Sequence, residues 1–350
     1  MGRRTARFLL HGMRPLDCST VRQRIVTLTL VVLGMLTQPR SAVGEAYAWT
    51  SLGNVAHAYE LQPPATDKQH IVLRRRFDTV SFEEGSRKMI FNGVAFYLNS
   101  SIIKYGNEWL IARADVDNVV GALLCPGNAL ATAQTSLVML DPGHGGDDPG
   151  ARDGWKLDEK RLTLDIARRA RAKLREFQVD ARLSRERDMS VSLEERCWRA
   201  ERLGATLFVS IHLNAARDRR TSGIETFIIP SAGYAPTADR EGAPFKVEKT
   251  AYPANHYDAA NAVLAYYLHK GLLASSRGED RGIRRARFHV IKSVSCPAAL
   301  VECGFMSNRQ EAEKLAQEAY RDSLAEGIAR GILTYLSRAR EAHLPPVSGL

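Results

Sequence analysis

Two histidines and two glutamates lie at positions where they could form a hydrolytic metal site. His144 and His212 each follow an apolar run typical of a buried strand, Glu302 ends a third such run, and Glu159 opens a helical pattern. Two imidazoles and a carboxylate are the three protein ligands of a catalytic zinc, whose fourth position stays open to water. A second carboxylate could take a proton from that water and return it to a leaving amine. The four residues therefore predict metal-assisted hydrolysis.

The chain from residue 136 onward alternates two patterns that can bring these residues to one place. Short apolar runs typical of strands are LVMLD, VDARLS, TLFVSIH, GIETFII, RFHVIK and AALVEC. Helical stripes lie between them over residues 162–177, 192–204 and 258–274, and further helices follow. This alternation predicts an α/β fold with a mostly parallel sheet and helices on both faces. The carboxyl ends of parallel strands meet at one edge of such a sheet, so the four residues can converge.

The segment around His144 is unusually rich in glycine. Residues 137–160 read LVMLDPGHGGDDPGARDGWKLDEK, with four glycines within seven positions of the histidine. Such a loop is costly to order, so a purpose is expected for it. We expect the glycines to let the backbone pass close to a metal and its substrate, and to leave room at the open coordination position.

Each candidate residue also has an ordinary structural explanation. The two histidines could be hydrogen-bonded structural residues, and Glu159 could complement a helix dipole. Glu302 ends a strongly apolar run, where an unpaired carboxylate is expensive, so function is favoured for it alone. Glu225 points either toward the site or to the opposite face, and Asn214 either binds substrate or shapes its loop. The prediction depends on the joint pattern.

Five motifs in this region resemble those of a known family in order and spacing. LDPGHGGDDPGA, LDEKRLTLDIARR, FVSIHLNA, GIETFII and ALVECGFMSN are similar to the zinc-dependent N-acetylmuramoyl-L-alanine amidases over residues 136–337. The resemblance implies that His144, Glu159 and His212 bind one Zn²⁺ and that Glu302 is the catalytic glutamate. It also implies a twisted, mostly parallel sheet surrounded by helices. All four site residues are present, so an active enzyme is implied.

The reaction is implied by this resemblance alone. It is hydrolysis of the amide that joins N-acetylmuramic acid to L-alanine in peptidoglycan, for cell-wall remodelling or daughter-cell separation. A zinc carboxypeptidase acting on wall peptides would suit the same four residues, but the flanking motifs favour the amidase. A non-catalytic wall-binding module is the other alternative, and the four polar residues argue against it.

Residues 1–44 have the order of a secretory signal peptide. Arg22 and Arg24 precede the apolar run IVTLTLVVLGML, and the small residues 42–44 form a cleavage site. The run is shorter than the roughly 20 residues of a membrane span, although an uncleaved anchor stays an alternative. We expect an exported protein of the periplasm or cell envelope, without a membrane anchor after cleavage. The segment carries +6 of the formal net charge of +10, so no nucleic-acid partner is indicated.

Residues 45–125 are predicted to form a small, mostly β accessory domain, joined by a linker at 126–135 to a catalytic domain at 136–340. RKMIF and VAFYL flank Asn92-Gly93, a strong hairpin signal, and IVLRR, TVSF and WLIA are further strands. WTSLGNVAHAYEL and NGVAFYLNSSIIKYGNEWLIARADV loosely resemble the copper amine oxidase N-terminal-like domains, without a copper-ligand cluster. We hypothesise that this domain binds the wall or an activating partner.

Three further features carry weaker predictions. Residues 231–257 are a long connection after the strand of Glu225, so we expect them to border and partly occlude the substrate groove, with a passive loop as the alternative. Residues 281–288, RGIRRARF, are expected to be a solvated basic face rather than a site for an anionic wall polymer. The four cysteines beyond the signal segment allow disulfides in an exported protein but do not resemble a zinc cluster: Cys125, Cys197, Cys296 and Cys303.

Overall fold

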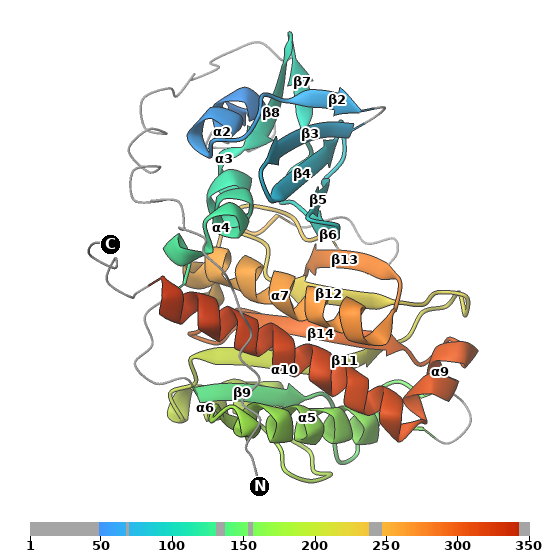
Figure 1. The fold of residues 1–350 in the computed structure, drawn as a ribbon. Coiled ribbons are helices and arrows are strands. Elements are labelled where there is room, and N and C mark those ends of the chain that lie inside the picture. The colour runs from blue at the N-terminus through green and yellow to red at the C-terminus, as the bar shows by residue number, and fades with distance from the viewer. Residues whose placement is uncertain (1–48, 68–69, 131–136, 153–156, 238–246, 343–350) are drawn as a thin grey trace, which may run out of the picture.

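The structure is a computed structural model that describes residues 49–67, 70–130, 137–152, 157–237 and 247–342. The predicted signal segment and part of the predicted linker lie outside these residues. The strands form a sheet of eleven and a separate sheet of three. Figure 1 shows the N-terminal elements, which include the strands β2 to β6 of the large sheet, above the remaining strands and their helices. The predicted fold class, a mixed α/β sheet flanked by helices and preceded by a small β region, is confirmed.

The strands that carry the candidate site form one half of the large sheet. Four of them are parallel neighbours, in the order β10 (Asp180–Leu183), β9 (Leu137–Pro142), β11 (Leu207–Asn214) and β14 (Ala298–Phe305). The strands β9, β11 and β14 read as nearly continuous apolar runs because helices cover both of their faces, whereas the edge strand β10 alternates exposed and buried residues. The next two are β12 (Ile224–Ile228), antiparallel to β14, and β13 (Asp280–Arg285), parallel to β12.

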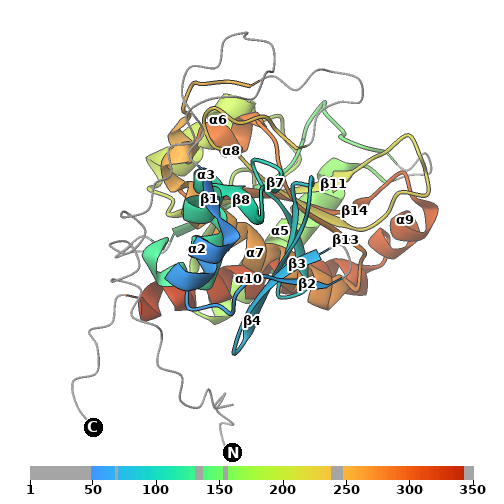
Figure 2. The same cartoon turned by 90° about the horizontal axis from the view of Figure 1, so that it is seen from above.

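Helices cover the two faces unequally. One face is covered by α5 (Glu159–Glu176), α7 (Asp258–Ser276) and α10 (Glu318–Glu341), and the other by the shorter α6 (Leu193–Arg202) and α8 (His289–Lys292). Figure 2 shows α6 and α8 together on the side of the sheet away from α10. The helix α9 (Arg309–Leu315) follows β14. Because α6 and α8 are short, the second face is covered less completely than the first.

One predicted strand is wrong. The run RFHVIK forms the end of a loop and the helix α8, and the strand of this region is β13, which lies just before it. The sequence of β13, DRGIRR, contains three arginines, so it shows no apolar alternation. Arg285 is nevertheless buried, with an exposed fraction of 1%. The expectation that residues 281–288 form a solvated basic face is therefore wrong at this residue.

The N-terminal strands extend the same sheet as an antiparallel meander. In order from β13 they are β6 (Val94–Tyr97), β5 (Lys88–Phe91), β4 (Asp78–Glu83), β3 (His70–Arg75) and β2 (Ala65–Asp67). The predicted hairpin is confirmed, since Asn92 and Gly93 join β5 to β6 with φ of 47° and 83°. The meander joins the catalytic sheet where Ile283 of β13 pairs with Phe96 of β6.

Further N-terminal elements pack beside this meander. The three-stranded sheet contains β1 (Trp49–Ser51), β8 (Glu108–Ala112) and β7 (Ile103–Tyr105), and α2 (Leu52–Ala58) follows β1. A run of short helical turns then leads toward α7, made of α3 (Arg113–Asp115), η2 (Val116–Val120), α4 (Gly121–Leu124) and η3 (Pro126–Asn128). One apolar cluster includes residues of both regions, from Leu52 to Leu336. The N-terminal region is therefore packed against the catalytic sheet.

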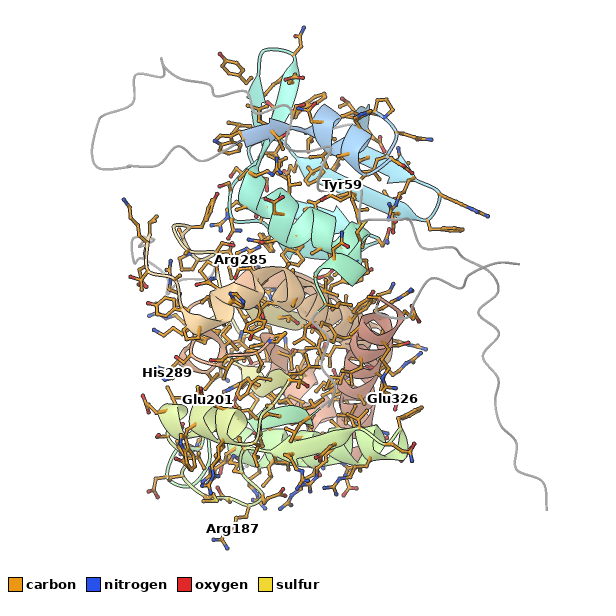
Figure 3. All side chains as sticks on the ribbon, turned by 90° about the vertical axis from the view of Figure 1, so that its left-hand side faces the viewer. Tyr59, Arg187, Glu201, Arg285, His289 and Glu326 are labelled. Carbon is orange, nitrogen blue, oxygen red and sulfur yellow. The ribbon has the colours of Figure 1, made fainter. Side chains whose placement is uncertain are left out.

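Buried charges lie at this junction. Arg285 and Asp115 are both buried, with Nη2 of the arginine 3.9 Å from Oδ1 of the carboxylate. Asp115 accepts hydrogen bonds from the backbone N–H groups of Asn99 and Ser100, at 2.7 and 3.0 Å. In Figure 3, Arg285 lies at the boundary between the N-terminal elements and the elements below them. The junction thus combines apolar packing with a paired buried charge.

The long connection 231–257 leaves the sheet at the end opposite to Glu225. β12 runs antiparallel to β14, so each residue after Glu225 lies farther from the carboxyl end of β14. In the described flanks, 231–237 and 247–257, Arg87 of the N-terminal region donates hydrogen bonds to the carbonyls of Ala235 and Pro236, both at 2.9 Å. The expectation that this connection borders the substrate groove is wrong for these flanks, because the sequence did not reveal the direction of β12.

Three cysteines are free thiols buried in the catalytic region: Cys197, Cys296 and Cys303. Burial raises the pKa of the Cys197 thiol to about 11 and that of Cys296 to about 12. Such thiols carry almost no thiolate near neutral pH, so they act as small apolar side chains.

Among the described residues, none of the helices has the length and apolar character needed to cross a membrane.

Candidate metal centre

Three of the four predicted site residues meet at the carboxyl end of the parallel strands. His144 lies in the loop after β9, His212 is near the end of β11, and Glu159 is the first residue of α5. Oε2 of Glu159 is 3.1 Å from Nε2 of His144, and its Oε1 is 2.9 Å from Nδ1 of His212. One ligand atom from each residue lies within 4.8 Å of the other two. The predicted convergence of these three residues is confirmed.

This donor set fits a zinc ion. Two imidazole nitrogens and a carboxylate oxygen are the ligands of many catalytic zinc sites, and bonds of 2.0–2.1 Å in a tetrahedron separate neighbouring ligand atoms by about 3.3 Å. Here the two imidazole nitrogens lie 3.1 and 2.9 Å from different oxygens of Glu159, and one ligand atom from each of the three residues lies within 4.8 Å of the other two, which leaves space for an ion between them. Glu159 is only 3% exposed, so its carboxylate needs compensating positive charge. A divalent cation between the three side chains would provide it.

The short distances between the three residues shift the pKa values of Glu159 and His144. Burial alone would raise the pKa of Glu159, but hydrogen bonds and charges from the two imidazoles outweigh it and hold that pKa well below the usual range. Burial alone would lower the pKa of His144, but Glu159 and Asp148 outweigh it and raise that pKa above its ordinary value. A bound cation would therefore replace protons that the side chains otherwise share.

Two glycines make room for the ligands themselves. A methyl group on Gly143 would lie 2.3 Å from Cε1 of His212, and one on Gly150 would lie 2.5 Å from Oε2 of Glu159. Gly150 also has a φ of 68°, which favours glycine. We expected glycine to leave room at the open coordination position. The structure shows instead that the space beside these two glycines is taken by the imidazole and the carboxylate.

Two buried arginines hold the loop that carries His144. Arg185 donates to the carbonyls of residues 142 and 143 at 3.0 and 2.8 Å, and Arg196 donates to those of residues 142 and 144, both at 2.7 Å. Arg196 is also ion-paired at 2.7 Å with Asp141, which is 1% exposed. Sequence reasoning missed both arginines, because an arginine in a charged stretch usually indicates solvent exposure. These hydrogen bonds fix the position of the loop backbone and therefore of His144.

Asp148 orients the first histidine. Its Oδ2 lies 2.7 Å from Nδ1 of His144, and its Oδ1 accepts a hydrogen bond from the backbone N–H of Gly150 at 3.0 Å. This contact leaves Nε2 of His144 facing Glu159. A carboxylate on the outer nitrogen of a metal-binding histidine fixes the ring and its tautomer. The sequence contained this signal only as an aspartate four residues after the histidine.

Glu302 is a half-buried residue on the strand next to His212. It is the register partner of His212 across β11 and β14, so the two side chains lie on the same face of the sheet. Among the described residues its Oε2 is buried without a hydrogen-bond partner. Burial raises its pKa well above the usual range, and the negative charges of Glu159 and Glu225 raise it further. A group held in this way is suited to accept and release a proton.

Glu225 faces the same side of the sheet, which answers the question left open by its strand position. It lies directly opposite Glu302 in the antiparallel pair of β12 and β14. Asn214 donates a hydrogen bond to Oε2 of Glu225 at 2.9 Å, and its own Oδ1 accepts one from the N–H of Ala215 at 2.7 Å. Asn214 therefore shapes the loop and holds Glu225.

The fold is a mixed α/β sheet flanked by helices, and its convergent side chains could hold a metal ion beside a carboxyl group, as in a metal-dependent hydrolase. The family model described as N-acetylmuramoyl-L-alanine amidase (Amidase_3) matches residues 138–334, which is more than half of the chain. This chain belongs to that family. The resemblance seen in the sequence motifs and the class of enzyme, an amidase, are thereby confirmed.

Two named relatives agree with this assignment. The N-acetylmuramoyl-L-alanine amidase AmiA of Salmonella typhimurium is 33% identical over 223 residues, which cover 58% of this chain and 77% of that protein. The amidase CwlM of Bacillus licheniformis is 35% identical over 207 residues, covering 59% and 70%. The solved structure of amidase AmiC2 of Nostoc punctiforme shows 35% identity over 59% of this chain and 99% of that one, with a TM-score of 0.49.

Proposed function

We propose that this amidase cleaves the bond between N-acetylmuramic acid and L-alanine in peptidoglycan with one zinc ion held by His144, Glu159 and His212. The observation that carries the proposal is the meeting of three suitable ligand atoms within 4.8 Å. Beside them lies Glu302, whose Oε2 is buried and has no hydrogen-bond partner within the part of the chain that the structure describes. Family membership supports the substrate, and the donor set supports the metal.

A bound zinc ion supplies a Lewis acid that polarises the scissile carbonyl and makes a water molecule more acidic. Glu302 takes a proton from the attacking water and passes it to the nitrogen of L-alanine as the C–N bond breaks. The products are the lactyl carboxylate of the sugar and a peptide with a free amino terminus. Asp148 keeps the ring of His144 oriented, and Arg185 and Arg196 keep its loop in place.

The biological setting follows from the substrate and from the sequence pattern. We infer that residues 1–44 direct export and that the enzyme acts in the periplasm or cell envelope, in cell-wall remodelling or daughter-cell separation. We keep the division into an accessory region at 45–125, a linker at 126–135 and a catalytic domain at 136–340 as a proposal. The accessory region is proposed to bind the wall or an activating partner. Peptidoglycan is the proposed substrate whether the accessory region binds the wall or an activating partner.

Mass spectrometry of digested peptidoglycan tests the reaction. The zinc-loaded full chain should release stem peptides with a free L-alanine amino group and leave glycan strands with free lactyl groups. A carboxypeptidase would instead release C-terminal amino acids and leave the sugar–peptide bond intact. A wall-binding module would bind the polymer and release nothing. Either of the last two results would contradict the proposed function.

A further inference from the structure

A row of charged side chains crosses the sheet from the metal centre toward the N-terminal region. His212 on β11 pairs in register with Glu302 on β14, and Glu302 pairs with Glu225 on β12. Next on β13 come Arg281 and Arg284, whose Nε atoms lie 3.1 and 3.4 Å from Oε1 of Glu225. Figure 1 shows these strands as neighbours in the sheet. The row therefore ends in two cations two strands away from the catalytic glutamate.

The two arginines carry more positive charge than their partner balances. Both contact the same oxygen of one carboxylate, and within the described residues neither has a second carboxylate at ion-pair distance. The other oxygen of Glu225 accepts a hydrogen bond from the neutral Asn214. One carboxylate and two guanidinium groups leave a net charge of +1 at this end of the row. That charge is available to an anionic ligand.

The guanidinium groups are fixed in place but accessible. Cζ of Arg284 lies 4.5 Å from the centre of the Tyr97 ring, and Cζ of Arg281 lies 5.2 Å from that of Phe305. The side chains keep exposed fractions of 26% for Arg281 and 23% for Arg284. An arginine held on an aromatic face loses little further freedom when it binds a carboxylate. Tyr97 belongs to β6, so the N-terminal region supplies part of this support.

The uncleaved substrate carries its negative charge on the peptide side. The carboxyl group of the muramic acid is consumed in the scissile amide, so the sugar at this bond is neutral and only the stem peptide offers carboxylates. Neighbouring strands are about 4.8 Å apart, which places β13 roughly 10 Å from β14. Two extended residues span about 7 Å, and an arginine side chain covers the remainder. The carboxylate of the residue after L-alanine is therefore within reach.

We propose that Arg281 and Arg284 form a specificity subsite that binds the carboxylate of the stem-peptide residue following L-alanine. The inference rests on the proposed function, because it takes the scissile amide to lie beside His212 and Glu302. It orients the substrate, with the peptide lying over β12 and β13 toward the N-terminal region and the glycan on the other side of the metal centre. Glu225 is a positioning residue that holds both arginines and contacts Asn214.

Two soluble muramyl peptides test the subsite. They differ only in the second residue of the peptide, whose carboxylates are free in one and amidated in the other. The wild-type chain should cleave the acidic substrate with a kcat/KM about 10- to 100-fold higher, as expected for a hydrogen-bonded ion pair. In Arg281→Gln and Arg284→Gln this preference should shrink toward one, mainly through a higher KM for the acidic substrate.

Controls separate this role from a structural one. Arg182→Gln removes an exposed arginine that is paired at 2.7 Å with Asp180 on the distant strand β10, and it should leave the preference unchanged. Zinc content and thermal stability are measured on every variant. Calorimetric binding of both substrates to Glu302→Gln should show the same preference without turnover.

The possible failures are distinguishable. A wild-type chain that cleaved both substrates equally would overturn the subsite while leaving the amidase intact. Equal losses on both substrates in the arginine variants would show that the arginines act only on the catalytic glutamate or on the fold, which also overturns it. A zinc-loaded wild-type chain that cleaved neither substrate would contradict the proposed function itself, and the subsite with it.

Discussion

The candidate metal centre and the junction with the N-terminal strands each contain an ionisable side chain with one buried atom that lacks a hydrogen-bond partner among the described residues. Among the described residues, the two buried side-chain atoms without a hydrogen-bond partner are Oε2 of Glu302 and Nη2 of Arg285. One lies on β14 beside the candidate metal ligands, and the other lies on β13 where the N-terminal strands join the sheet. Both atoms are buried, yet their surroundings differ.

The neighbouring charges have opposite effects at the two places. Burial lowers the pKa of Arg285, and the negative charges of Asp115, 3.9 Å away, and of Asp258 offset part of that effect because they favour its charged form. Glu302 has Glu159 and Glu225 as its charged neighbours, and both disfavour its ionisation. A compensated buried charge can serve the fold, whereas an uncompensated acid is stable only as a neutral group or beside a cation. We therefore assign the junction to structure and Glu302 to chemistry.

The largest expected effect is on the metal ligands. His144→Ala and His212→Ala each leave two ligands, so zinc affinity should fall well beyond the 10- to 100-fold typical of losing a group that only orients a ligand, and turnover should fall to background. The fold should survive, because the sheet and helices have their own core. Metal analysis and circular dichroism on the same samples check both points. Full zinc content with full activity in both variants would show that the ligands are misassigned.

At the junction, Arg285→Met should act on stability instead. Removing one member of a buried ion pair leaves Asp115 buried without its cation, which costs about 3–5 kcal/mol of unfolding free energy. Zinc content and kcat of the folded fraction should not change. Denaturant unfolding measures the loss, with Arg182→Met as the control, which is expected to unfold like wild type because its side chain is exposed. A stable Arg285→Met chain that had lost its zinc would reverse the two assignments.

A smaller effect is expected at Asp148. Asp148→Asn keeps the size of the side chain but weakens the contact with Nδ1 of His144, so zinc affinity should fall about 10- to 100-fold. Stability should stay near that of wild type, because the side chain of Asp148 is 64% exposed. Competition with a chelator of known affinity gives the ratio. An unchanged zinc affinity would mean that the loop backbone alone orients the histidine.

No effect is expected from the connection after β12. A flexible Gly/Ser sequence of the same length in place of residues 238–246 should leave hydrolysis of intact peptidoglycan and of a soluble muramyl peptide unchanged, because the described flanks lie at the opposite end of β12 from Glu225. Parallel assays on the two substrates check this. A gain on the intact wall alone would restore the idea that this connection covers the site.

The sequence predicted those elements whose residue types match their burial or their turn geometry. Apolar runs such as that of β11 were recognisable as buried strands, and the Asn92-Gly93 turn was recognisable as a hairpin. The strand β13 was not, because a buried arginine and two arginines bound to one glutamate look like a solvated basic segment. The pattern of polar and apolar residues predicts a strand only where the polar residues are exposed and the apolar residues are buried.

The candidate site shows the same division. The convergence of the candidate metal ligands could be predicted because their residue types and their positions near strand ends and a helix start indicate that chemistry. Arg185 and Arg196 could not, since nothing local shows that their guanidinium groups bind backbone carbonyls 40 to 55 positions away. The direction of β12 was equally hidden, because an apolar strand reads the same whether it runs parallel or antiparallel to its neighbour. Contacts between residues far apart in the sequence can be identified only once the fold is known.

The central claim is that Glu302 performs proton transfer beside a metal that other residues hold. Its most direct test is to measure bound zinc and turnover of a soluble muramyl peptide on the same preparations of wild type and Glu302→Gln. We predict one zinc ion per chain in both, with kcat lowered by about 10²–10⁴-fold or more in the variant. Loss of zinc in Glu302→Gln would make this residue a ligand, and retained turnover would remove it from the mechanism.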